Sequence, residues 1–303
     1  MRIGVNCGAD PGGDSGIDGL IARAKEMEAR GFHTMWLANG LGLDAINTQT
    51  VIGSATERIE LGTAVVPSFP RHPMAMAQQA LTAQAVCGGR FTLGIGLSHR
   101  PIIENMLGLS YDKPARHMRE YVSVLAPLLR GEPVHFEGED YRVGGALNVP
   151  GAAPVPLLIA ALGDLMLGVA GSAADGTVVG LTGPKTIESH IVPRLRAAAD
   201  AAGRPSPRVV ASFPTALTHD PGAARDRVDQ QMGMYAMLPS YRAMLDREGV
   251  AGPGDIAVVG DEETLDAALG RLRDIGVTDY DATLVSVDEG SDARTLDFLQ
   301  SRL

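Results

Sequence analysis

The chain has 303 residues, of which 45 % are hydrophobic and 20 % are charged, and its formal net charge is −10 at pH 7. This length accommodates one enlarged α/β barrel or two ordinary domains, and a composition without low-complexity tracts excludes a disordered chain. The acidic balance argues against a nucleic-acid partner, because releasing counterions from phosphates needs a basic surface.

Short apolar runs alternate with amphipathic stretches through the first third of the chain. Apolar positions spaced three and four apart predict helices, and short apolar runs bounded by glycine or proline predict strands. The predicted strands are 2–7, 33–37, 60–66 and 91–95, and the predicted helices are 17–30, 44–56 and 73–86. The glycine-rich stretch 8–16 is expected to be a loop.

The alternation pauses after residue 95 and then resumes. A helical turn over 100–106, a helix over 113–129 and a hairpin of 134–136 with 141–143 are predicted in the pause. Further strands are predicted at 157–161, 177–181, 208–215 and 279–285. Further helices are predicted at 164–174, 184–202, 223–237 (continuing past a break at Pro239 to 248), 262–275 and 293–303.

Eight buried strands that each precede a helix indicate a parallel sheet, and their number favours a closed (β/α)8 TIM-like barrel. An open doubly wound sheet would be expected to carry G-x-G-x-x-G after its first strand, and residues 8–14 lack that spacing. We therefore expect one domain over 1–303, with insertions at about 100–156 and 223–254. The loops after the strands are where a barrel places its chemistry.

The sequence shows no clear membrane-targeting segment and few cysteines. The weakly charged stretch 155–182 is interrupted by Pro156, Gly163, Gly168, Gly171 and Gly176, so no membrane span is expected. The first residues lack the apolar core of a secretory signal. Two cysteines, Cys7 and Cys87, are too few for a disulfide framework or a zinc site. A reducing, cytoplasmic location is the expectation.

The residues that several classes of catalysis require are missing from the expected positions. None of the three lysines falls in a predicted strand, which disfavours a Schiff-base enzyme. The histidine and carboxylate spacings of a hydrolytic metal site are missing, so no metal is predicted. The predicted strand ends are glycine-rich, apolar and nearly uncharged, which suits a bulky aromatic redox cofactor better than a pair of acid and base side chains.

The run Gly94-Ile95-Gly96-Leu97-Ser98-His99 ends the fourth predicted strand. Its two glycines allow the backbone to approach a ligand closely, and Ser98 and His99 offer hydrogen-bond donors. The alternative is a plain strand-to-loop turn in which His99 is solvated.

Two predicted helices open on Leu162-Gly163-Asp164 and on Leu181-Thr182-Gly183-Pro184. Free N–H groups and the positive end of the helix dipole make adjacent helix N-termini a phosphate cradle, to which Lys185 could add charge. Ordinary capping by Asp164 and Thr182 is the alternative.

The remaining conspicuous residues favour structural roles. Arg71 and His72 are expected to support the helix that begins at Pro73. Trp36 ends the second strand as a core filler or as a wall for a cofactor. The run 232–238, which is rich in methionine, is more typical of core than of an interface, although it could cover the site. No function is assigned to His33, His117, His135, His190 and His219.

A family resemblance rests on three motifs in order: Leu61-Gly62-Thr63-Ala64-Val65-Val66-Pro67, Arg71-His72-Pro73, and Gly88-Gly89-Arg90-Phe91-Thr92-Leu93-Gly94-Ile95-Gly96. The chain resembles the luciferase-like monooxygenase superfamily, and more narrowly its branch that uses the deazaflavin coenzyme F420. Later pieces agree, namely 159–163, 174–176 and 276–279.

The resemblance implies a barrel that holds the cofactor ring at its strand ends. It implies a non-prolyl cis bond at Ala64–Val65 that backs the ring. It also implies Gly96, Leu97, Ser98 and His99 beside the ring and ribityl chain, and a homodimer. The backbones expected near the phosphate are Ala161, Leu162, Gly163, Thr182 and Gly183.

The sugar-phosphate and alcohol dehydrogenases of this superfamily carry acid/base residues where this chain has Ala38-Asn39-Gly40 and His99. We therefore expect an F420-dependent oxidoreductase that moves hydride to a small organic substrate in the reductase direction. Asn39 is predicted to bind the ring edge, and His99 to donate a proton or orient the substrate. The alternatives are an FMN-dependent two-component monooxygenase and a flavin-binding protein without catalysis.

Overall fold

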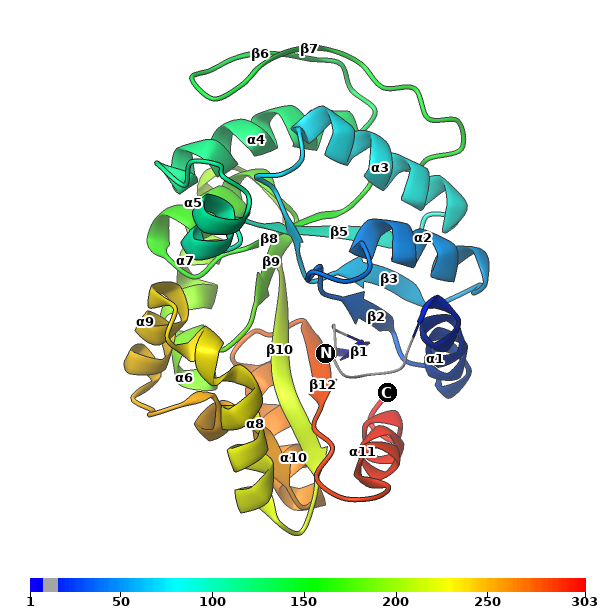
Figure 1. Cartoon of the computed structure of the whole chain (residues 1–303), viewed down its shortest axis with the longest axis vertical. Coiled ribbons are helices and arrows are strands. Elements are labelled where there is room, and N and C mark those ends of the chain that lie inside the picture. Colours follow the sequence, from blue (N-terminus) through cyan, green and yellow to red (C-terminus); the bar gives the residue numbers. More distant parts are fainter. Residues whose placement is uncertain (8–15) are drawn as a thin grey trace.

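The computed structural model describes residues 1–7 and 16–303, and it is built around a closed barrel of eight parallel strands. Each barrel strand pairs with the next one along the chain, and the last, β12, pairs with β1 to close the ring (Figure 1). The barrel strands are β1 (Arg2–Asn6), β2 (Thr34–Leu37), β3 (Glu60–Thr63), β5 (Phe91–Gly96), β8 (Leu157–Ala160), β9 (Gly176–Val179), β10 (Arg208–Leu217) and β12 (Asp279–Leu284). The predicted TIM-like barrel is confirmed.

Helices surround the barrel and bury their apolar faces against it (Figure 1). They are α1 (Ile17–Arg30), α2 (Ala45–Ser54), α3 (Pro73–Val86), α4 (Pro114–Leu129), α5 (Asp164–Ala173), α6 (Pro184–Thr186), α7 (Val192–Ala201), α8 (Pro221–Ala236), α9 (Pro239–Glu248), α10 (Glu262–Asp274) and α11 (Ser291–Gln300). Helices α1 and α3 have the predicted bounds. Gly31 ends α1 with φ 87°, a backbone conformation that favours glycine.

The structure corrects three of the predicted elements. The third strand is interrupted at Ala64–Val65 and continues as β4 (Val66–Pro67). The helix predicted over 184–202 contains a π-helical turn, η2 (Ile187–Ile191), just before Pro193, whose missing N–H prevents a regular α-helical bond there. A strand that was not predicted, β11 (Val258–Gly260), pairs with the extended end of β10 after the 3₁₀ turn η3 (Pro253–Ile256).

The segment between β5 and β8 carries additions to the barrel. A π-helical turn, η1 (Pro101–Met106), precedes α4, and the hairpin of β6 (Val134–Glu137) and β7 (Arg142–Gly145) extends beyond α3 and α4 at the top of Figure 1. The Glu120 carboxylate on α4 accepts hydrogen bonds from the backbone N–H groups of residues 139, 140 and 141, which fastens the hairpin turn to the helix.

The barrel interior changes character from one end to the other, since every second residue of a strand points inward. At the N-terminal ends of the strands, which we call the base, Arg2, Glu60, Arg208 and Asp279 form ion pairs. The middle is filled by Trp36, packed with Leu158, Val178 and Val210. The indole needs Gly4 and Gly62, because a Cβ at Gly62 would lie 2.2 Å from a Trp36 ring carbon.

Candidate active site

The C-terminal ends of the strands form the mouth of the barrel, where the predicted site residues lie. The peptide bond Ala64–Val65 is cis, as the resemblance implies. The Val65 side chain lies against the end of β5, since a Cβ at Gly96 would be 2.7 Å from Val65 Cγ2 and 3.3 Å from Ala160 Cβ. Glycine at 96 therefore keeps the mouth open beside Val65.

The Leu97-Ser98-His99 segment follows β5 and is half-buried. Ser98 has φ 59°, a conformation uncommon outside glycine, and its carbonyl accepts a hydrogen bond from the Tyr111 hydroxyl at 3.1 Å. The His99 ring centroid lies 5.4 Å from that of Tyr241 and 6.3 Å from that of Tyr235. An aromatic wall thus surrounds the predicted proton donor.

Burial holds His99, Tyr111 and Tyr241 in their neutral forms. Burial lowers the pKa of His99, so its imidazole is uncharged at pH 7 and keeps one N–H donor. Burial raises the pKa of Tyr111, and it raises that of Tyr241 to about 12. These three side chains can offer hydrogen bonds and are uncharged at neutral pH, and the cation beside them, Arg100 over the Tyr111 ring, is paired with Glu104.

One of the two predicted helix N-termini is open. Gly163 is the N-cap of α5 and receives no side-chain cap, and a Cβ there would meet no atom within 4 Å. Asp164, which was predicted as a possible cap, is instead turned to Arg194 in an ion pair. The Leu162 carbonyl accepts from His190 Nε2 at 2.7 Å, while the Ala161 side chain is buried in the core.

The second N-terminus is already occupied by a carboxylate. Glu248, at the end of α9, accepts hydrogen bonds from the N–H groups of Lys185 at 3.0 Å and Thr186 at 2.7 Å. The N-cap is Gly183 and not Thr182, whose hydroxyl donates to the Gly180 carbonyl. The N–H groups of Lys185 and Thr186 are therefore not free, while the predicted phosphate contacts of the Thr182 and Gly183 backbones stay a prediction.

A buried polar cluster beneath the mouth was missed from the sequence. Asp281 of β12 is fully buried, and its Oδ2 accepts from Asn6 Nδ2 at 2.8 Å and from the Ser212 hydroxyl. Its Oδ1 has no hydrogen-bond partner among the described residues. Burial raises the pKa of this carboxyl to about 6. The alternation of Asp279, Asp281 and Thr283 along a buried strand was the signal that could have revealed it.

The cis segment is also held from outside by a residue to which no role was assigned. His117 on α4 is buried; its Nε2 lies 2.9 Å from the hydroxyl of Ser68, and its ring stacks on Phe69 at 3.9 Å. Burial lowers the pKa of His117 to about 4, so it is neutral. The Ser68 N–H donates to the Gly96 carbonyl, which joins the segment after β4 to the end of β5.

Other predictions near the mouth have mixed outcomes. Arg71 ion-pairs with Asp44 and His72 caps α3, which confirms structural roles for both. Asn39 uses its Oδ1 to accept from the Ala45 N–H at 3.1 Å, so its predicted contact with the ring edge stays a prediction. The run 232–238 is only partly core, because Ala236 is buried and Met232 packs against the core whereas Met234 is 81 % and Met237 76 % exposed. The loop predicted over 8–16 lies, except for Gly16, outside the described residues.

These residues fit a flat ring with an anionic tail. The side chains nearest the mouth are small, and Gly96 cannot gain a Cβ without moving Val65. Cβ atoms at Gly163 and Gly180 would meet nothing within 4 Å, so both backbones border open space. The α5 N-terminus then supplies N–H donors for a phosphate. No group of three or more metal-binding side chains occurs within residues 1–7 and 16–303.

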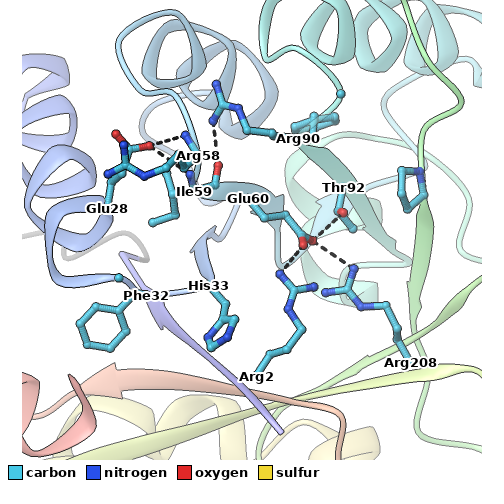
Figure 2. A pocket seen from close by; sticks show the side chains of 14 residues that line it. Arg2, Glu28, Phe32, His33, Arg58, Ile59, Glu60, Arg90, Thr92 and Arg208 are labelled. Atoms are coloured by element: carbon cyan, nitrogen blue, oxygen red, sulfur yellow. Dashed lines mark hydrogen bonds and ion pairs between the residues drawn. The ribbon is translucent and has the colours of Figure 1, made fainter. Parts of the chain in front are cut away.

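A cavity of about 530 Å³ lies at the opposite end of the barrel. Figure 2 shows Glu60 at its centre, where it receives hydrogen bonds from Arg2, Thr92 and Arg208. Arg90 is held there by backbone carbonyls, including that of Ile59 at 2.7 Å. The charges of Arg2 and Arg208 are balanced by those of Glu60 and Asp279, and the cavity lies at the opposite end from the strand ends where barrels carry chemistry.

Comparison with known proteins agrees with the geometry. The family model described as luciferase-like monooxygenase matches residues 1–279. An F420-dependent glucose-6-phosphate dehydrogenase of Nakamurella multipartita is 28 % identical over 289 residues, which cover 89 % of this chain and 82 % of that protein. None of the described helices has the length and apolar character that a membrane crossing requires.

Two solved structures share the fold at lower identity. The F420-dependent tetrahydromethanopterin reductase of Methanopyrus kandleri has a TM-score of 0.81 and 21 % identity, covering 100 % of this chain and 98 % of that one. The oxygenating constituent of 3,6-diketocamphane monooxygenase from Pseudomonas putida, in complex with FMN, has a TM-score of 0.77 and 16 % identity, covering 99 % and 96 %.

Proposed function

The chain belongs to the luciferase-like monooxygenase family, and from this premise we propose that it is an oxidoreductase that transfers hydride between coenzyme F420 and a small organic substrate. The observation that carries the proposal is that the described side chains around His99 include no unpaired charge. His99 is neutral, Tyr111 and Tyr241 keep their protons, and the cis segment is held rigidly beside Gly96. Hydride transfer needs orientation and exclusion of water more than a charged acid and base.

The residues of the chain have distinct tasks in this proposal. When bound, F420 supplies a ring carbon that carries hydride as a two-electron unit. Ala64 and Val65 back the ring, Gly96 to Ser98 border it, and the N–H groups that follow Gly163 hold the phosphate. Neutral His99 donates its N–H to an electronegative atom of the substrate, and Tyr241 packs beside it to exclude water. We propose substrate reduction as the working direction.

Titration of the purified protein with F420 and, separately, with FMN tests this function. Saturable binding of F420 that is at least tenfold tighter than that of FMN is the expected result, measured by equilibrium dialysis. Tight FMN binding without F420 affinity would overturn the proposal in favour of a two-component monooxygenase. The FMN complex among the proteins of the same fold keeps that second candidate in the test.

The same preparation distinguishes an enzyme from a cofactor-binding protein. Reduced F420 should be oxidised when an activated enone or imine is added, as followed by its absorbance. F420 that binds but remains reduced with every compound of such a panel would indicate sequestration without catalysis.

We also propose that the chain forms a homodimer through α2 and α3. These two helices contact each other and contain no charged residue, in a chain that is 20 % charged. Their exposed positions are small or neutral, with Val51 on α2 and Val86 on α3 as the large apolar ones. Light scattering should show a dimer, and Val51→Arg should dissociate it, whereas a monomeric wild-type protein would refute this interface.

A further inference from the structure

Exposed large apolar side chains are concentrated on segments that follow barrel strands. Nine of them lie on the segments that follow β2, β5, β8 and β10 along the chain, and we call this set the apolar rim: Leu41, Leu43, Met106, Leu107, Leu109, Leu165, Met234, Tyr235 and Met237. Leu41, at 80 %, and Met234, at 81 %, are almost fully exposed. The others of this kind in the described chain are Val51, Val86 and Leu303. An exposed apolar set of this size marks a binding surface.

The rim is continuous with the aromatic wall around His99. Tyr235 belongs to both, since its ring centroid lies 6.3 Å from His99. Tyr111 anchors the segment after β5 through the Ser98 carbonyl, and that segment carries Met106, Leu107 and Leu109. A molecule whose reacting end is at His99 would therefore rest its remaining surface on the rim.

The arginines that flank these loops are already paired with acids. Arg71 pairs with Asp44, Arg194 with Asp164, and Arg100 with Glu104 at 2.5 Å. Glu248 occupies the α6 N-terminus that would otherwise attract an anion. A phosphate or carboxylate on the substrate would have to displace one of these carboxylates, whereas an uncharged substrate would not.

We propose that the substrate is a bulky, neutral, apolar molecule with a conjugated carbon–carbon double bond, which reacts beside His99 while its apolar body lies on the rim. This inference rests on the proposed function. With a carbonyl group conjugated to the double bond, hydride from the reduced cofactor would add to one carbon, and the resulting enolate would take a proton from water at the neighbouring carbon. The substrate gains two electrons and the deazaflavin loses two.

A matched series of enones tests the substrate class. The series contains cyclohexenone, a neutral enone of steroid size, and the same large enone carrying a phosphate far from its double bond. With reduced F420, kcat/KM should rise at least tenfold from the small to the large neutral compound and fall at least tenfold on phosphorylation. Equal values, or a preference for the phosphorylated compound, would overturn the inference.

A separate measurement of F420 binding distinguishes failure of the proposed function from failure of the proposed substrate class. If F420 does not bind, the proposed function fails first. If F420 binds and only charged or small substrates are reduced, the function stands and the apolar substrate class is wrong.

Variants of the rim give a second test. The double variant Met234→Gln, Met237→Gln should raise KM for the large enone about tenfold and leave its value for cyclohexenone and the Kd for F420 unchanged. Leu303→Gln, an exposed apolar position away from the rim, is the matched control and should change none of these. Unchanged KM in the double variant, or an oligomeric state altered by it in light scattering, would overturn the assignment and point to a protein partner instead.

Discussion

The two ends of the barrel are built from the same eight strands but differ in how their polar groups are paired. At the base, two arginines and two acids fill the interior and neutralise one another. At the mouth, glycine and alanine line the same strands, the imidazole of His99 is neutral, and backbone groups border open space. The polar groups of the base pair with one another and need no ligand. At the mouth, backbone groups are left for a ligand to contact.

This contrast shows why cavity size alone misleads here. The 530 Å³ cavity lies at the base, where Glu60 and its partners already satisfy one another (Figure 2). Burial would lower the pKa of Arg208, but its hydrogen bond to Asp279 and the charge of Glu60 raise it. Function is expected where polar groups lack partners, as at the Gly163 terminus and at Asp281 Oδ1 among the described residues.

The largest expected effect comes from breaking the base. Asp279→Ala removes the buried acid that faces Arg208 at 2.6 Å and leaves that half-buried guanidinium, together with Arg2, to share Glu60 alone. The free energy of unfolding in urea should fall by about 3 to 5 kcal/mol. The F420 affinity of the folded protein should stay the same. Asp266→Ala, which breaks an exposed pair with Arg302, is the control and should leave the free energy of unfolding nearly unchanged.

Asp281 lies on β12 between the base and the mouth. Its titration should appear in the pH dependence of the free energy of unfolding. A carboxyl whose folded pKa is raised to about 6 stabilises the fold fully below pH 4, and that contribution is lost as the pH rises to 6. The loss amounts to about 3 kcal/mol, from a shift of roughly two pH units. Asp281→Asn should abolish this decline in urea titrations between pH 4 and 7.

Asp266→Asn is the control for that titration. The hydrogen bond from Arg302 lowers the pKa of Asp266, so this group titrates below the window of pH 4 to 7. The control should therefore keep the slope of the wild-type protein. A slope that is identical in Asp281→Asn would mean that Asp281 is ionised throughout the window.

A smaller free-energy change, confined to binding, is expected at the mouth. Gly96→Val places side-chain atoms against Val65 and Ala160 and narrows the space beside the cis segment. The Kd for F420 should rise about 10- to 100-fold, which is about 1 to 3 kcal/mol. Gly270→Val on α10, where a Cβ meets nothing within 4 Å, should leave the Kd unchanged. Equal effects of the two variants would argue against Gly96 as part of the site.

Local patterns were sufficient for the barrel. Each of the eight barrel strands begins within one residue of its predicted start, because each is an apolar run bounded by glycine, proline or a charged residue. Val258-Val259-Gly260 was missed, since three residues are too few to show alternation. The cis bond at Ala64–Val65 was predicted from the family motif and not from the periodicity of apolar residues.

The site was less predictable because its contacts join distant parts of the chain. The hydrogen bond between Glu248 and Thr186 spans 62 residues, and that between Asn6 and Asp281 spans 275. The approach of Tyr241 on α9 to His99, which follows β5, likewise joins distant parts of the chain. Sequence spacing within one element contains no information on such pairs. The positions of the strand ends could therefore be predicted, but not which distant side chains contact them.

Trp36 has a practical consequence that follows from its position. It is the single tryptophan of the chain, fully buried directly beneath the mouth between Gly4 and Gly62. All of the indole fluorescence therefore originates at one point next to the proposed ring site, and its emission should be that of an apolar environment. Energy transfer from this built-in donor to a bound chromophore would report occupancy of the mouth without any label.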